Sequence, residues 1–175
     1  DYTWNKADVC LPKLVPNEFD ELLRLIKEGW SKRIVKGAFF VNKVVIKDLP
    51  TYKARLKYEL GVLKSMGFEG YFILVERLVR WSKENGVRVG CGRGSIGGSL
   101  VAFLLNITDI DPIRFGLIFE RFINPSRQDL PDADLDFMSS KRHKVIDHIY
   151  NEYGEENVAG ISNFNTLGLA SALRD

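Results

Sequence analysis

Apolar residues recur at helical spacing in three segments of the first half of the chain. An apolar residue at every third or fourth position indicates a helix with one buried face. The spacing predicts helices over residues 17–30, 51–67 and 69–85, with Asn17 as a cap for the first and Gly67 as the stop signal of the second. These predictions depend on Phe19, Leu22, Leu23, Ile26, Leu56, Leu60, Leu63, Phe72, Val75, Leu78 and Val79.

The pattern changes in the second half, where glycine-rich and alternating segments replace the long amphipathic ones. A short strand is predicted at 87–89, followed by a glycine cluster at 90–98 and an apolar helix at 99–105. Residues 131–137 alternate acidic and apolar residues, as a strand with one buried face does. A charged helix over 140–153 follows. Because helices and strands mix without regular alternation, the predicted fold class is α+β, with a mixed sheet and packed helices.

The alternating segment, the acidic heptad at 131–137, carries Asp132, Asp134 and Asp136 on one expected face. Aspartate is depleted from strands and neighbouring like charges repel, so this row destabilises the chain unless a cation lies beside it. The pattern therefore favours a divalent-metal site. A calcium loop of the EF-hand type is excluded, because Phe137 and His143 hold the positions of its glycine and glutamate. A solvated edge strand with protective charges is the alternative.

The glycine cluster reads GCGRGSIGGS over residues 90–99 and lies between a predicted strand and a predicted helix. Glycine lets the backbone approach a ligand closely, and free N–H groups at a helix start bind phosphate oxygens. Arg93, Ser95 and Ser99 add donors, so phosphate binding is favoured over a tight turn built for helix packing. The dinucleotide fingerprint matches weakly, because no second strand ends in an acid about 20 residues later, and the ATPase phosphate loop lacks its Gly-Lys-Ser/Thr.

The glycine cluster and the acidic heptad are chemically complementary. The first can hold a triphosphate, and the second can hold two magnesium ions that bridge it. The pair therefore predicts nucleotidyl transfer.

The composition is that of a globular protein without membrane spans, which is compatible with the predicted nucleotidyl transfer. The 175 residues are 45% hydrophobic, which suits one domain with a sizeable core. No apolar run reaches the roughly 20 residues that span a bilayer, and no signal peptide is present, so we expect no membrane partner. Two cysteines without metal-like spacing fit a cytoplasmic protein. The net charge of +2 neither requires nor forbids a nucleic-acid partner.

Five groups of motifs resemble, in one order, the bacterial DNA polymerase III alpha subunits, which are the C-family replicative DNA polymerases. They are MGFEGYF at 66–72, GRGS at 92–95 with GSLVA at 98–102, ITDIDP at 107–112, FERFINP at 119–125 and PDADLDF at 131–137. The resemblance runs from about residue 50 to the end of the chain. Cys91 stands where the family usually has proline, and Ile96 and Gly97 replace smaller, alanine-rich residues.

The resemblance implies a palm of the polymerase beta type, in which a primer 3′-hydroxyl attacks the α-phosphate of a dNTP and pyrophosphate leaves. It places two Mg²⁺ ions on the catalytic residues Asp134 and Asp136, with Asp132 in support. The residues that it places near the nucleotide are Gly92, Arg93, Gly94, Ser95, Arg121 and Asn124.

The resemblance also implies an organisation of the chain. Residues 1–49 would lead into the palm, 50–164 would form its first part, and 165–175 would begin a thumb. The family's third catalytic aspartate and its fingers would lie further downstream, so this chain alone is expected to be inactive. The implied partners are primer–template DNA, dNTP, the rest of the polymerase and a sliding clamp.

Two other functions stay open at this point. One is a non-catalytic accessory module that keeps the palm shape without the chemistry. The other is a standalone nucleotidyltransferase that acts on a small substrate.

Overall fold

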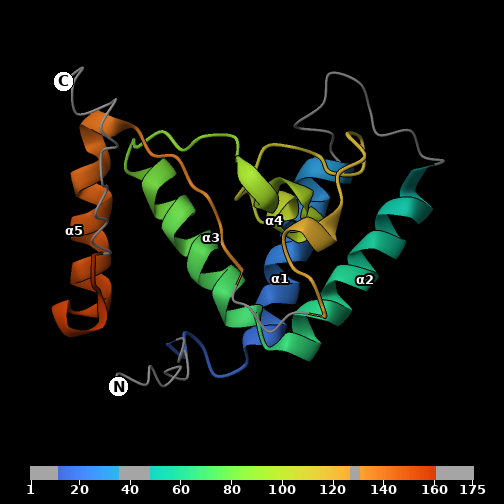
Figure 1. Cartoon of the computed structure of the whole chain (residues 1–175), viewed down its shortest axis with the longest axis horizontal. Coiled ribbons are helices and arrows are strands. Elements are labelled where there is room, and N and C mark those ends of the chain that lie inside the picture. The colour runs from blue at the N-terminus through green and yellow to red at the C-terminus, as the bar shows by residue number, and fades with distance from the viewer. Residues whose placement is uncertain (1–11, 36–47, 127–130, 161–175) are drawn as a thin grey trace, which may run out of the picture. The chain divides into compact units, whose positions relative to one another are not determined.

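The computed structural model describes residues 12–35, 48–126 and 131–160 (Figure 1). This part of the chain is built from helices and connecting turns. They are α1 (Glu18–Trp30), the π-helical turn η1 (Ser31–Val35), α2 (Leu49–Met66), α3 (Glu69–Glu84), the 3₁₀ turn η3 (Gly94–Gly98), α4 (Leu100–Leu104), η4 (Phe119–Arg121), η5 (Ser139–Lys141), α5 (Arg142–Tyr153) and η6 (Glu155–Asn157). None of the helices in these ranges has the length and apolar content needed to cross a bilayer.

The predicted α+β fold with a mixed sheet is wrong for the described residues, which contain no strand. The segments at 87–89 and 131–137 meet only through an isolated antiparallel bridge between Val89 and Phe137. One physical reason is visible at Ala133, whose backbone N–H donates to the hydroxyl of Tyr71 at 3.1 Å. A side chain thus takes the place that a neighbouring strand's carbonyl would fill in a sheet.

The chain divides into two compact units, residues 1–142 and 143–175. The described part of the second unit consists of most of α5 together with η6. The expected start of a thumb at 165–175 lies outside the described residues. The candidate site and the cavity described below belong to the first unit.

The helices predicted from apolar spacing are confirmed. Asn17 caps α1 by accepting a hydrogen bond from the Asp20 N–H at 3.3 Å. Gly67 ends α2 in the left-handed conformation, with φ at 69°. Helix α2 begins at Leu49, two residues before the predicted start, because Pro50 can occupy the first turn of a helix.

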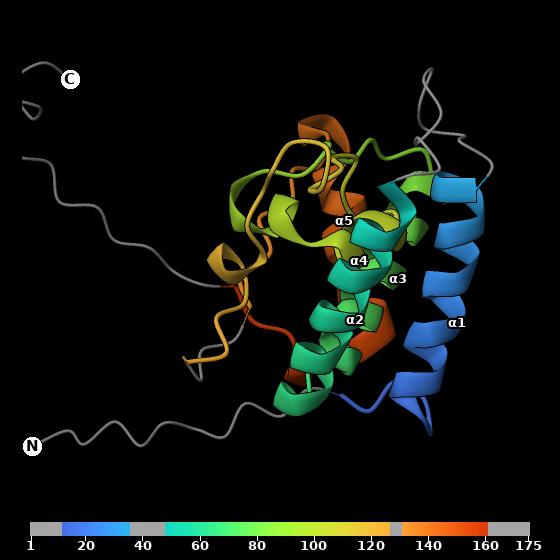
Figure 2. The same cartoon turned by 90° about the vertical axis from the view of Figure 1, so that its right-hand side faces the viewer.

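Helix α4 lies at the centre of the first unit and contacts α1 and α2 (Figures 1 and 2). All five of its residues are buried, as the apolar run predicts. They join a core to which α1, α2 and α3 contribute Leu22, Leu25, Ile26, Tyr52, Val62, Leu63, Phe72, Ile73, Val75 and Val79. Segment 12–35 is therefore part of the same core as the motif-bearing residues.

The start of α4 is held by a buried carboxylate. Glu59 of α2 is fully buried and accepts hydrogen bonds from the Leu100 N–H at 2.9 Å and the Val101 N–H at 3.0 Å. The Ser99 hydroxyl and the Arg55 guanidinium also donate to it, at 2.9 and 2.7 Å. Burial raises the pKa of Glu59, and the two backbone N–H groups and the Arg55 guanidinium oppose the shift by favouring the ionised form.

Candidate functional site

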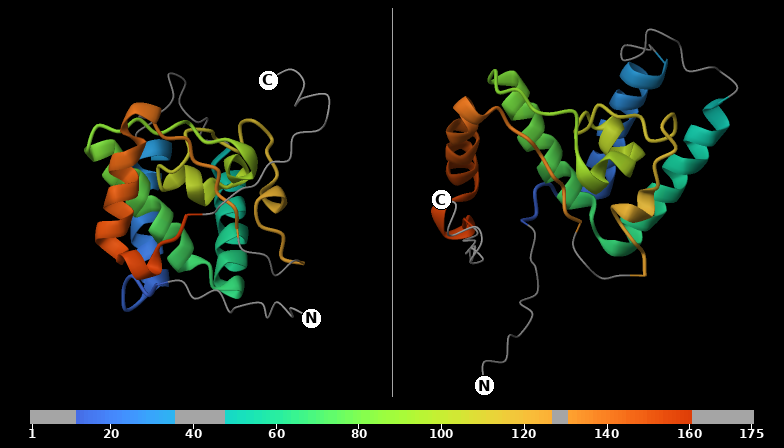
Figure 3. Two further views of the ribbon diagram at one scale, coloured as in Figure 1. Left: turned by 60° about the vertical axis from the view of Figure 1, so that its left-hand side comes forward. Right: turned by 45° about the horizontal axis from the view of Figure 1, so that its top comes forward.

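The acidic heptad runs beside the glycine cluster, although 40 or so residues separate them in sequence (Figure 3). The bridge between Val89 and Phe137 consists of two backbone hydrogen bonds, from the Gly90 N–H to the Asp136 carbonyl at 2.8 Å and from the Met138 N–H to the Arg88 carbonyl at 3.0 Å. The structure therefore brings together the two motifs that the sequence analysis pairs.

The two faces of the heptad differ as its alternation predicts. Ala133 and Leu135 pack against the hydrophobic core. Asp132 and Asp136 are exposed, and Asp134 is half-buried. The row of carboxylates is thus carried on an extended segment that is anchored by its apolar residues.

Arg93 of the glycine cluster reaches across to two of the three carboxylates. Its Nε donates to Asp136 Oδ1 at 2.9 Å, and its Nη2 lies 3.9 Å from Asp134 Oδ1. The hydrogen bond to Asp136, together with the charges of both aspartates, holds the pKa of Arg93 above its usual range. The Arg93 side chain is 62% exposed, so solvent screens these ion pairs and they can exchange with other ions.

Two glycines allow the close approach of the motifs. Gly94 has φ at 67°, and a Cβ at this position would lie 2.3 Å from Asp134 Oδ2. Gly92 has φ at 98°, and its Cβ would lie 2.7 Å from Thr108 Cγ2. Any side chain at either position would strain the backbone and displace its neighbour.

The predicted phosphate donors do not all face this cluster. Ser95 Oγ lies 3.5 Å from the Asp132 carbonyl oxygen, so this half-buried hydroxyl is at the cluster's edge. Ser99 is fully buried and caps α4 through the Ala102 N–H at 3.1 Å, and its hydroxyl also donates to Glu59, so it faces the core. A helix-capping role explains this serine better than phosphate binding.

Arg121 and Asn124 are exposed and lie outside this set of contacts. Asn124 Oδ1 accepts a hydrogen bond from the Ser126 N–H at 2.9 Å. Within the described residues, no hydrogen bond or ion pair connects Arg121 or Asn124 to Arg93 or to the aspartates of the heptad. Their place near a nucleotide stays a prediction.

The carboxylates suit magnesium only if other ligands complete the coordination. Across the ranges that the structure describes, no group of three or more His, Cys, Asp or Glu residues could hold a metal ion. Magnesium usually binds proteins through one or two carboxylates and takes its remaining ligands from water and substrate phosphates. Asp134 and Asp136 already share one cation, the Arg93 guanidinium, and therefore fit that arrangement.

Comparison with known proteins identifies the family. The sequence model of the bacterial DNA polymerase III alpha NTPase domain matches residues 20–175. The chain belongs to the DNA polymerase III alpha family. It is 49% identical to the DNA polymerase III subunit alpha of Yersinia pestis over 174 residues, which are 99% of this chain and 15% of that protein.

Other members of the DNA polymerase III alpha family give similar values. The subunit alpha of Aquifex aeolicus is 46% identical over 176 residues, covering 98% of this chain and 15% of the relative. The Escherichia coli K12 subunit is 46% identical over 156 residues, covering 89% and 13%. The chain thus spans about 15% of the length of these polymerase III alpha relatives.

The sequence analysis missed two residues that hold segments of this chain in place. Tyr71 on α3 anchors Ala133, and burial raises the pKa of its hydroxyl. Arg33 of η1 donates to the Thr108 carbonyl and to Asp109 Oδ1, at 2.8 and 2.9 Å. The motif MGFEGYF contains Tyr71 and gave a signal for it, but Arg33 lies in a segment with no recognised motif.

Proposed function

We propose that the glycine cluster and the acidic heptad are the nucleotide-binding and metal-binding parts of a DNA polymerase active site. The observation that carries the proposal is the contact of Arg93 with both Asp134 and Asp136, beside a glycine that admits no side chain. Membership of the DNA polymerase III alpha family supports the same function.

Arg93 can bind the triphosphate because its ion pairs with the two aspartates are exposed to solvent and can be replaced by pairs with phosphate oxygens. A guanidinium forms bidentate hydrogen bonds with phosphate oxygens as readily as with carboxylates. When a dNTP arrives, Arg93 turns from the aspartates to the phosphates, and the Ser95 hydroxyl adds a further donor. The backbone at Gly92 and Gly94 lets the phosphates approach closely.

The two aspartates that Arg93 releases are then free for magnesium. Asp134 and Asp136 would hold the ions, with Asp132 in a supporting role. When bound, the ions supply charge neutralisation for the phosphoryl group and activation of the attacking hydroxyl.

The reaction is template-directed nucleotidyl transfer. The primer 3′-hydroxyl loses its proton to solvent and its oxygen forms a bond to the α-phosphorus of the dNTP. The bond from that phosphorus to the bridging oxygen breaks, and pyrophosphate leaves with the electron pair. In this scheme the chain's own groups hold the triphosphate in line, which is the main protein contribution in phosphoryl transfer.

Primer–template DNA, dNTP and the other parts of the polymerase are the partners of this site. The proposal concerns the complete polymerase subunit, because the chain spans about 15% of its relatives. A sliding clamp as partner is an expectation from the family resemblance.

The test replaces each carboxylate in a full-length polymerase subunit that carries this sequence. Asp134→Asn and Asp136→Asn keep size and shape but remove the charge that magnesium needs. We expect each to reduce the primer-extension rate by about 100-fold or more, in line with the loss of a major electrostatic group in an active site. Asp132→Asn should reduce the rate less.

Asp147→Asn is the matched control, because Asp147 is an exposed aspartate on α5 outside the heptad. It should extend primers at the parental rate. Near-normal extension by the Asp134 and Asp136 variants would contradict the proposal and favour a non-catalytic accessory module. Magnesium-dependent nucleotide transfer by this chain without DNA would instead favour a small-substrate nucleotidyltransferase.

A further inference from the structure

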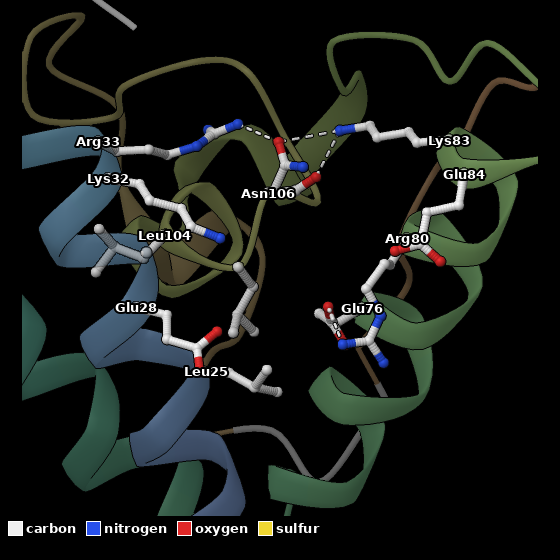
Figure 4. A pocket seen from close by; sticks show the side chains of 12 residues that line it. Leu25, Glu28, Lys32, Arg33, Glu76, Arg80, Lys83, Glu84, Leu104 and Asn106 are labelled. Atoms are coloured by element: carbon white, nitrogen blue, oxygen red, sulfur yellow. Dashed lines mark hydrogen bonds and ion pairs between the residues drawn. The ribbon is translucent and has the colours of Figure 1, made fainter. Parts of the chain in front are cut away.

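A cavity lies in the first unit, away from the glycine cluster and the acidic heptad. It has a volume of about 400 Å³ and is bounded by α1, η1, α3 and the turn that follows α4 (Figure 4). Pockets of this size accommodate small organic ligands. The cavity shares no residue with the proposed polymerase site.

Three cationic side chains gather around Asn106 at one end of this cavity. Lys83 Nζ donates to the Asn106 carbonyl at 2.7 Å and to its Oδ1 at 3.1 Å. Arg33 donates to the same Oδ1 from the opposite side, and Lys32 points into the cavity below it (Figure 4). Asn106 has φ at 61°, which sets it on a sharp turn between these cations.

The positive charge at this end is only partly neutralised. Arg33 pairs with Asp109 at 2.9 Å. Within the described residues, neither Lys32 nor Lys83 forms an ion pair. Burial lowers the pKa of Lys83, the charge of Arg33 lowers it further, and Asp109 opposes the shift. A bound anion would therefore relieve an unfavourable charge at Lys83.

The rest of the cavity limits what can be attached to that anion. Leu25, Leu104 and Leu105 provide apolar walls. Three acids also line the cavity. Glu28 and Glu76 lie away from the Asn106 end, with Glu76 paired to Arg80 at 3.5 Å, and Glu84 follows Lys83 on α3 (Figure 4). A second anionic group would be repelled there, whereas a neutral or amino-bearing body would be accepted.

We propose that this cavity binds the phosphate group of a small phosphorylated molecule, with the phosphate at Lys32, Arg33 and Lys83. A monophosphate with a neutral organic body, such as a nucleoside monophosphate, fits both the cationic end and the apolar walls. The planar guanidinium of Arg80 can stack on a base in such a ligand. The proposal is independent of the function proposed for the glycine cluster.

The test measures binding by calorimetry to the full-length subunit, without DNA and with EDTA present. The probes are AMP, inorganic phosphate and pyrophosphate. We expect AMP to bind, and Lys32→Gln and Lys83→Gln each to weaken it by about tenfold, the effect of one charge-assisted hydrogen bond. Lys32 is exposed, so Lys32→Gln tests the site even if Lys83→Gln disturbs the Asn106 turn.

Lys27→Gln is the matched control, because Lys27 lies on α1, which bounds the cavity, but does not line the cavity itself. It should bind AMP as the parent does, and so should Arg93→Gln. Phosphate or pyrophosphate binding that depends on Lys32 would support the phosphate site and show that the organic body adds little. Absence of binding by all three probes, or binding that is lost in Arg93→Gln and kept in Lys32→Gln, would overturn the proposal.

Discussion

Arg93 and Gly94 are neighbours in the chain and meet the same carboxylate in different ways. Arg93 attracts Asp134 by charge, and Gly94 allows it to come close by having no side chain. The position of Asp134 therefore depends on the space beside Gly94 as much as on its ion pair.

A methyl group at Gly94 should displace Asp134. We expect Gly94→Ala to reduce primer extension by the full-length subunit by about tenfold or more, since small misplacements of reacting groups carry penalties of up to about 10²-fold. The left-handed backbone should also lower stability by about 1 kcal/mol. Steady-state incorporation kinetics and thermal unfolding measure the two effects.

Gly116→Ala separates these two effects. Gly116 also has a positive φ, at 62°, but an added Cβ would meet nothing within 4 Å. It should lose stability to a similar degree and keep its extension rate. Equal loss of activity in both variants would assign the effect to backbone strain rather than to Asp134.

Glu76 is a buried acid with an incomplete set of partners. Its side chain is 8% exposed, and its Oε2 atom is buried without a hydrogen-bond partner. Burial raises its pKa above the usual value of 4.5, and Arg80 offsets this only in part. A raised folded pKa means that stability is fully present below pH 4.5 and is lost as the pH rises through the folded pKa.

Glu76→Gln should therefore be more stable than the parent at pH 8 by about 1 kcal/mol, and the difference should vanish near pH 4. Urea unfolding of this chain at several pH values measures it. Glu84→Gln is the control, because Glu84 lies on the same helix and is exposed. A Glu76→Gln variant with an unchanged pH profile would show that Glu76 is not penalised by burial.

At the scale of elements, the stability of α4 depends more on its contacts with α2 than on hydrogen bonds within α4 itself. A helix of five residues has few internal hydrogen bonds, and Glu59 satisfies two of its free N–H groups. The same carboxylate accepts a hydrogen bond from the hydroxyl of Ser99, the last residue of the glycine cluster. The helix and the cluster are thus fixed by one side chain.

Glu59→Gln should destabilise the chain by about 3 kcal/mol or more, because an amide nitrogen cannot accept from these donors and the Arg55 guanidinium loses its charged partner. Chemical unfolding of this chain provides the measurement. Glu69→Gln, on the first turn of α3, supplies the comparison and should change stability by well under 1 kcal/mol. Similar losses in both variants would contradict a special role for Glu59.

The helices could be predicted from the sequence because their signals are local. Asn17, Gly67 and the apolar spacing of α1 to α3 each act within a few residues. The acidic heptad was predicted as a strand because its alternation is real, but strand formation depends on distant partners. Tyr71 supplies one of those partners, and no pattern within the heptad could reveal it.

At the scale of the whole molecule, the pairing of the glycine cluster with the acidic heptad was predictable because each motif has its own chemistry. The cavity beside α1 and α3 could not be predicted from the sequence. Its residues come from three separate stretches that look like ordinary amphipathic or charged sequence. In the sequence, the spacing of Arg55 and Glu59 is typical of an ion pair on the surface of a helix. Only the structure shows that Glu59 is fully buried.

The contacts of Arg33 bear on the order in which the chain folds. Its guanidinium donates hydrogen bonds to Asn106, Thr108 and Asp109, which follow it in sequence by 73, 75 and 76 residues. Closing so long a loop lowers the chain entropy before any contact compensates, so such contacts form slowly. Asp109 donates its N–H to the Cys91 carbonyl at 2.8 Å, inside the glycine cluster. We therefore expect this cluster to reach its final geometry late in folding, after helices α1 to α3 have formed.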